Sequence, residues 1–248
     1  YGALALGDGK PPVHINRPPE IDDQRDQVRN DIRKRLNASF QKGRRSAKVE
    51  AYDYSFQMAE KLIRRKELFA DFAPKELERY GSHPLGRHIL QSKRLIEEGV
   101  LFVQCHSYHW DTHGDNFNMH LDLVPQIDKP FAALIEDWHQ SGLLDNVLVL
   151  LMSEFGRTPK INQRLGRDHW PEAWSLAMAG CGLNQGLVLG KTTPNGAWVD
   201  GQEYDIGHIF HTVFKAMDID PLQTEYRNND QPLPIAHEDC GPIKELLA

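Results

Sequence analysis

Residues 147–158 read VLVLLMSEFGRT, a wholly apolar run that passes directly into a polar one. Six consecutive apolar residues, 147–152, are typical of a strand that is covered on both faces of a sheet. In open α/β sheets, ligands bind beyond the carboxyl ends of such strands. The stretch therefore predicts an α/β core with a functional site at residues 153–158.

Elements predicted on either side of this strand extend the α/β pattern. The apolar run at 100–105 predicts a strand, and the helical periodicity of 123–141 precedes the strand at 147–152. Strand, helix and strand in that order favour a right-handed βαβ unit and a largely parallel sheet. Two more strands and a helix are expected farther along: 174–179, 187–189 and 206–217. We therefore expect a mixed, largely parallel sheet flanked by helices within residues 100–248.

The first 99 residues are mostly helical in pattern and are expected to pack on that core. One amphipathic helix, over about residues 21–42, is marked by four apolar residues spaced four apart: Val28, Ile32, Leu36 and Phe40. Asp22 or Asp23 would cap its start. Further helices are expected at 47–65 and 84–98.

Composition limits the classes of function. The chain has 248 residues, 40% hydrophobic and 26% charged, as in a globular protein with a buried core. Its formal net charge of -6 gives no general attraction to nucleic acid or to anionic membranes. No apolar stretch approaches the ~18–20 residues of a membrane span, and no signal peptide is visible. Because the chain begins at Tyr1, we expect a processed product or a fragment.

The three cysteines, Cys105, Cys181 and Cys240, are widely spaced and form no CxxC pair. That spacing excludes a zinc-finger framework and argues against a disulfide scaffold, although one disulfide with one free thiol remains open.

A cluster of acids and imidazoles follows the strand expected at 100–105. Asp111 and His113 are two residues apart, so in extended backbone their side chains leave on the same side and can share one divalent cation. Rival ligands crowd the same region: His106, His109, Asp115 and His120. The alternative is a polar loop whose Asp and His side chains cap turns.

A second cluster follows the strand at 147–152. Glu154 is expected to bind a metal, to act as a base, or to form a structural salt bridge with Arg157, since an acid there is rarely buried without a partner. Gly156 would let the backbone pass close to a ligand. The planar fork of Arg157 suits phosphate, sulfate or carboxylate.

The third cluster, GRDHW at residues 166–170, precedes the next expected strand. His169 is a candidate metal ligand or a general acid near neutral pH, and a buried, hydrogen-bonded histidine is the alternative. Asp168 would be a ligand or would orient an imidazole. Three such clusters at expected strand ends together argue for a metal site.

Other catalytic signatures are missing from the sequence. It contains no P-loop, no GxGxxG after a strand, no GxSxG elbow and no HExxH motif. Ser107, Thr112 and Ser153 are possible nucleophiles without a distinctive context.

The same motifs carry a resemblance to a known family. The matching stretches are RYGSHPLGRHIL (79–90), EEGVLFVQC (97–105), WDTHGDNF (110–117), GLLDNVLVLLMSEFGRTPKIN (142–162) and GRDHWPEAWSLAMAG (166–180). On these, the chain resembles the C-terminal part of the domain of unknown function 1501 family, whose members are often described as sulfatase-like and look related to the alkaline phosphatase superfamily. The likeness covers about residues 75–248.

That resemblance implies an alkaline-phosphatase-like or sulfatase-like core, a metal-centred site and a periplasmic or secreted location. Carried over by order, the metal ligands would be Asp111, His113, Glu154 and His169. Phe155 stands where the superfamily has a histidine, and the superfamily's N-terminal nucleophile has no match here. The core is therefore expected to be incomplete in this chain, or the site to be altered.

The leading hypothesis is a metal-dependent hydrolase of sulfate or phosphate esters, acting on a small molecule or a glycan. The four expected ligands would hold a divalent cation (Zn, Mn, Mg or Ca), Arg157 would hold the anionic group, and Asp168 would act as a ligand or a support. The alternative is a non-catalytic module of the same fold that binds an anionic glycan or a protein.

Overall fold

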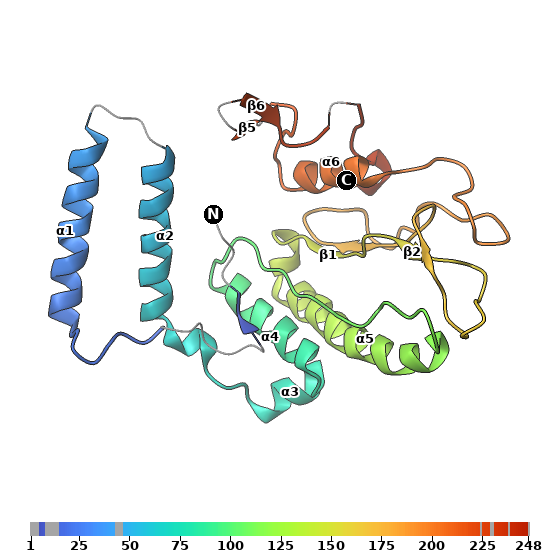
Figure 1. Cartoon of the computed structure of the whole chain (residues 1–248), viewed down its shortest axis with the longest axis horizontal. Coiled ribbons are helices and arrows are strands. Elements are labelled where there is room, and N and C mark those ends of the chain that lie inside the picture. The colour runs from blue at the N-terminus through green and yellow to red at the C-terminus, as the bar shows by residue number, and fades with distance from the viewer. Residues whose placement is uncertain are drawn as a thin grey trace. The chain divides into compact units, whose positions relative to one another are not determined.

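The computed structural model describes residues 5–7, 15–42, 47–223, 225–228, 231–237 and 239–247. The chain divides into two compact units, residues 1–106 and 107–248, drawn together in Figure 1. Unit 1 is helical, whereas unit 2 combines helices with short strands.

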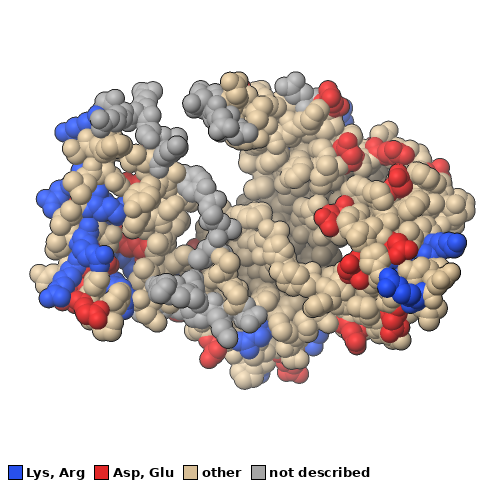
Figure 2. Space-filling model, viewed as in Figure 1, with Lys and Arg blue, Asp and Glu red and all other residues tan. Residues whose placement is uncertain are grey.

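Two long helices of unit 1, α1 (Asp23–Gln41) and α2 (Ala47–Arg64), lie side by side (Figure 1). Arg33 and Asn37 of α1 both donate to one carboxylate oxygen of Asp53 in α2, at 2.6 and 2.9 Å. On the face drawn in Figure 2, Lys and Arg side chains gather over this helix pair. Polar contacts therefore link two helices with a strongly charged surface.

The amphipathic helix predicted for this region is confirmed, but about half of the surface of its apolar residues is exposed. Asp22 caps α1 as expected, accepting a hydrogen bond from the backbone N–H of Arg25 at 2.8 Å. The four apolar residues spaced four apart remain exposed: Val28 (51%), Ile32 (44%), Leu36 (65%) and Phe40 (52%).

Three shorter helices form the buried part of unit 1: η2 (Lys66–Phe69), α3 (Pro74–Tyr80) and α4 (Pro84–Glu97). They bury Leu68, Tyr80, Leu85, Ile89, Leu90 and Leu95. The strand predicted at 100–105 is wrong, since these residues form a loop in which Leu101 and Phe102 are exposed. The run is apolar, but within the described part of the chain it has no neighbouring strand to satisfy a hydrogen-bonding ladder.

Unit 2 is built on α5 (Asn116–Ser141), which starts earlier than the sequence predicted and continues through two prolines, Pro125 and Pro130. Its inward face buries Leu123, Pro130, Ala133, Leu134 and Trp138. A short η3 turn (Leu143–Asp145) leads into strand β1 (Val149–Leu151), the centre of the predicted apolar run.

The strands of unit 2 pair in twos. β1 pairs with β4 (Ala177–Ala179), β2 (Gly156–Arg157) with β3 (His169–Trp170), and β5 (Glu225–Asn228) with β6 (Gln231–Pro234). All three pairs are antiparallel, and no parallel pair occurs among the described residues. The segment between β1 and β4 contains the β2–β3 hairpin and no helix. A parallel pair would need a long crossover connection, usually a helix. The expected parallel sheet is therefore not observed, although the α/β class is.

The rest of unit 2 contains α6 (Ile206–Ala216) and a short η4 turn (Lys244–Leu246), while the strand predicted at 187–189 is absent. Among the described residues, no helix combines the length and the apolar character needed to cross a bilayer.

Candidate metal centre

The first part of the site is the loop that enters α5. Thr112 is fully buried and donates from its hydroxyl to Asn116 Oδ1 at 2.6 Å. Its two neighbours, Asp111 and His113, face outward with side chains 66% and 33% exposed. A buried threonine thus anchors the loop between the two side chains that the sequence singled out.

The second part is the hairpin formed by β2 and β3, in which Arg157 lies opposite His169. The loop between the strands closes through paired contacts of Thr158 and Asp168. The N–H of Thr158 donates to the Asp168 carbonyl at 2.9 Å, and the N–H of Asp168 donates to the Thr158 hydroxyl at 3.0 Å. The hairpin thereby presents Arg157, Asp168 and His169 from one short segment.

Backbone hydrogen bonds hold the hairpin loop against the α5 entry loop. The N–H of Arg167 donates to the Thr112 carbonyl at 3.1 Å, and the N–H of Asp115 donates to the Arg164 carbonyl at 3.0 Å. Gly166 lies so close that a Cβ there would be 2.1 Å from the carbonyl carbon and oxygen of His113. Only a glycine fits this approach without displacing backbone.

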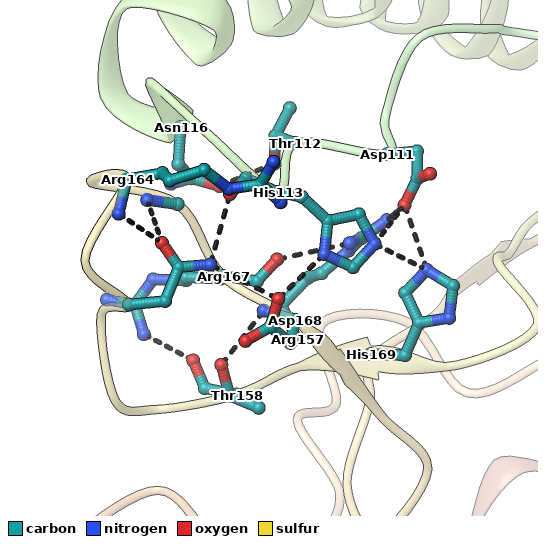
Figure 3. Close-up of polar contacts among 12 residues, drawn as sticks. Asp111, Thr112, His113, Asn116, Arg157, Thr158, Arg164, Arg167, Asp168 and His169 are labelled. Carbon is teal, nitrogen blue, oxygen red and sulfur yellow. Dashed lines mark hydrogen bonds and ion pairs between the residues drawn. The ribbon is translucent and has the colours of Figure 1, made fainter.

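Three ligand-type atoms converge where the two loops meet (Figure 3). Asp111 Oδ1 lies 3.0 Å from His113 Nε2 and 2.8 Å from His169 Nε2, and the two nitrogens are 3.2 Å apart. Ligands bound at about 2.0–2.2 Å to one cation in tetrahedral or octahedral geometry lie roughly 3 Å apart. The spacing of the three atoms therefore fits one divalent cation.

Asp168 contacts the ring nitrogen of His113 that does not face the other two ligand atoms. His113 Nδ1 donates to Asp168 Oδ1 at 2.7 Å, and the side-chain amide of Asn162 donates to the same oxygen at 3.1 Å. Because Nδ1 contacts Asp168, the other ring nitrogen of His113, Nε2, is the one that faces Asp111 and His169. A carboxylate behind a ligating histidine is the usual support of protein metal sites.

Hydrogen bonds keep both carboxylates of the site ionised. The bond from His169, followed by that from Arg157, lowers the pKa of the Asp111 carboxyl to about 2. The bond from His113, with a smaller contribution from Asn162, lowers the pKa of Asp168. At neutral pH the carboxylates of Asp111 and Asp168 therefore both carry a negative charge.

Arg157 is engaged within the protein. Its Nη2 donates to Asp111 Oδ1 at 2.8 Å and to the Trp110 carbonyl at 2.9 Å, and Nη1 donates to the Arg167 carbonyl at 3.2 Å. The structure thus pairs Arg157 with Asp111 rather than with Glu154.

Glu154 lies exposed in the bend after β1 and does not join the three converging ligand atoms. Its neighbour Phe155 contacts the His169 imidazole, with ring centroids 4.3 Å apart and the rings tilted by 34°. Phe155 thus packs against a candidate ligand.

The rival ligands near WDTH also lie outside the group. Asp115 accepts from the Asn118 amide at 2.7 Å, and His120 Nδ1 bonds to the Asn116 carbonyl at 2.7 Å. His106 and His109 are likewise not among the three converging side chains.

Sequence reasoning missed Asn162, which bridges the two loops by donating to the His113 carbonyl and to Asp168 while its Oδ1 accepts from two backbone N–H groups. Asparagine is a common turn residue, and no motif around Asn162 marks such a role.

The family model described as Protein of unknown function (DUF1501) matches residues 1–247, and the chain belongs to this family. No curated protein and no solved structure matches the chain.

Proposed function

We propose that this member of the DUF1501 family is a metal-dependent hydrolase of sulfate or phosphate esters, with Asp111, His113 and His169 as the ligands of its cation. The observation that carries the proposal is the convergence of one carboxylate oxygen and two imidazole nitrogens within 3.2 Å of one another. Three protein ligands leave a coordination position for water or substrate, as in catalytic zinc sites. The exposed side chains of Asp111 and His169 leave that position accessible.

The donor set narrows the choice of metal. Two imidazoles and one carboxylate suit Zn or Mn better than Mg or Ca, which take mainly oxygen ligands. When bound, such a cation supplies Lewis-acid polarisation of an ester oxygen and lowers the pKa of a water molecule.

The chain's own residues orient the ligands. Asp168 orients the His113 imidazole through Nδ1, and Arg157 holds the carboxylate of Asp111. In the hydrolysis, water oxygen forms a bond to sulfur or phosphorus, the bond to the alcohol oxygen breaks, and the alcohol leaves with a proton. Water is the proposed nucleophile. The hydroxyls of Thr112 and Ser153 donate within the protein, and that of Ser107 accepts from the Trp110 indole N–H at 2.7 Å.

The ester class is supported by the resemblance to the alkaline phosphatase superfamily, in which an Asp and a His follow one strand, as Asp111 and His113 do in chain order here, and a later His corresponds to His169. The proposed alkaline-phosphatase-like core and the periplasmic or secreted location have the same support.

The second candidate is a non-catalytic module that binds an anionic glycan or a protein. Arg157 favours the protein-binding form of this module, because three hydrogen bonds of the guanidinium that was expected to hold an anionic group go to the protein itself.

Manganese binding and ester turnover test the proposal together. Chelator-treated protein is titrated with Mn²⁺, followed by electron paramagnetic resonance, and assayed with aryl sulfate and aryl phosphate esters. We expect Mn²⁺ to bind and to restore turnover. His169→Ala should lower Mn²⁺ affinity by more than about 100-fold, since even loss of a supporting residue costs about 10–100-fold. His139→Ala, on the exposed surface of α5, is the matched control.

The results distinguish the hydrolase from the non-catalytic module and also test the assignment of each ligand. Binding without turnover of either ester class favours the non-catalytic module. A His169→Ala protein that binds Mn²⁺ as well as wild type overturns the ligand assignment. Glu154→Gln should keep the wild-type affinity, and a loss as large as that of His169→Ala would make Glu154 a ligand after all.

A further inference from the structure

A second group of metal-ligand side chains lies at the start of α6. Asp205 caps this helix: its Oδ1 accepts from the backbone N–H of His208 at 3.2 Å and lies 2.7 Å from His208 Nδ1. The backbone N–H of Asp205 in turn donates to His208 Nδ1 at 3.2 Å. Two ligand-type side chains are thus held together by the helix cap.

The C-terminal tail runs along the same helix and brings a thiol to this cap. His211 Nε2 donates to the His237 carbonyl at 2.7 Å, and the N–H of Ile243 donates to the buried hydroxyl of Thr212 at 2.9 Å. Cys240 lies between these two anchors. Its position is set by tail contacts that a helix cap by itself does not require.

Gly207, in the first turn of α6, makes room for the sulfur. A Cβ at this position would lie 2.5 Å from Cys240 Sγ. The absence of a side chain lets the thiol reach the Asp205–His208 pair, and the ligand atoms of Asp205, His208 and Cys240 all lie within 4.8 Å of one another.

The chemistry of these three groups differs from that of the first cluster. A cap needs one acceptor and the backbone N–H groups, so it accounts for Asp205 and His208 but not for a sulfur beside them. A thiolate with an imidazole and a carboxylate is a ligand set for Zn²⁺ and other thiophilic cations rather than for Mg²⁺, Ca²⁺ or Mn²⁺.

We propose that Asp205, His208 and Cys240 form a second cation site, selective for Zn²⁺ and similar thiophilic ions, that ties the C-terminal tail to the start of α6. On binding, the S–H bond of Cys240 breaks, its proton passes to solvent, and the thiolate bonds to the cation. The site stands independently of any hydrolase activity at Asp111, His113 and His169.

Cobalt spectroscopy isolates this site, because Co²⁺ bound to a thiolate gives near-ultraviolet charge-transfer absorption and Co²⁺ bound to oxygen and nitrogen ligands alone does not. The full chain, with its thiols reduced, is titrated with Co²⁺. We expect the charge-transfer band in wild type, its loss in Cys240→Ser, and its retention in Cys181→Ser, the matched cysteine control. The band should also persist in His113→Ala, in which the first cluster is broken.

A wild-type protein without the band, or a Cys240→Ser protein that keeps it, overturns the proposal. Wild-type protein provides a second measurement that needs no variant. Labelling of Cys240 by a thiol reagent, followed by peptide mass spectrometry, should slow by about tenfold when free Zn²⁺ is about ten times its Kd. An unchanged labelling rate at saturating Zn²⁺ contradicts the assignment.

Discussion

The two ligand clusters of unit 2 resemble each other in composition but differ in what holds them. The first cluster (Asp111, His113 and His169) lies between two loops joined by several backbone hydrogen bonds and by Asn162. The second cluster (Asp205, His208 and Cys240) rests on a helix cap and a tail, where Cys240 Sγ has a weak 3.6 Å contact with a carbonyl. We therefore expect the first centre, which backbone hydrogen bonds hold on both sides, to be preorganised for its proposed cation. We expect the second centre, which includes the tail, to gain order when its proposed cation binds.

The two clusters also differ in the residue that orients the histidine. His113 donates to the carboxylate of Asp168, which lies outside the first cluster. In the second cluster, His208 Nδ1 approaches Asp205, which is itself a proposed ligand. The first cluster thus has a separate residue that orients its imidazole.

Two glycine substitutions should separate the clusters most strongly. In Gly166→Ala the new Cβ would lie 2.1 Å from His113 backbone atoms, so we expect a loss of about 1–3 kcal/mol in the free energy of unfolding and loss of Mn²⁺ binding. Gly207→Ala should cost less, because the atoms that its Cβ meets, Cys240 Sγ at 2.5 Å and Asp205 Oδ1 at 3.2 Å, belong to side chains rather than to backbone. Urea denaturation measures both, and Gly241→Ala, which meets open space, is the control. Equal losses at Gly166 and Gly207 would contradict the difference in bracing.

Removing the supporting charge should have an intermediate effect. Asp168→Asn keeps the size of the side chain and an acceptor for His113 but removes the negative charge, so Mn²⁺ affinity should fall by about 10–100-fold. Calorimetry measures the change in affinity. The Co²⁺–thiolate band should remain unchanged in the same variant, and its loss would show that the clusters are not independent.

The acid dependence of stability should show the smallest effect. The folded-state pKa of Asp111 is about 2, below its ordinary 3.8, so its hydrogen bonds stabilise the metal-free protein above about pH 4. This contribution is lost as pH falls from about 4 toward 2. Asp111→Asn should flatten that part of the urea-midpoint profile relative to wild type. Parallel profiles for the two proteins would mean that these exposed contacts do not stabilise the fold.

Local patterns predicted the helices well. The four-residue spacing over 21–42 corresponds to α1, and the periodicity over 206–217 corresponds to α6. Strand pairing was predicted poorly, because the apolar run at 100–105 forms no ladder and β1 finds an antiparallel partner. Helix hydrogen bonds are local to the sequence, whereas a strand is completed by a partner that its own residues do not specify.

The sequence by itself determined the candidate ligands: Asp111 and His113 two residues apart, Glu154 after the apolar run, and Asp168 and His169 side by side. Only the tertiary structure decided that His169 joins Asp111 and His113 while Asp168 stands behind, and that Glu154 lies outside the group. It also revealed the Cys240 cluster, which no sequence motif marks. The reason is physical: ligand convergence depends on backbone hydrogen bonds between distant loops and on close approaches at glycines, and neither leaves a periodic signal in the chain.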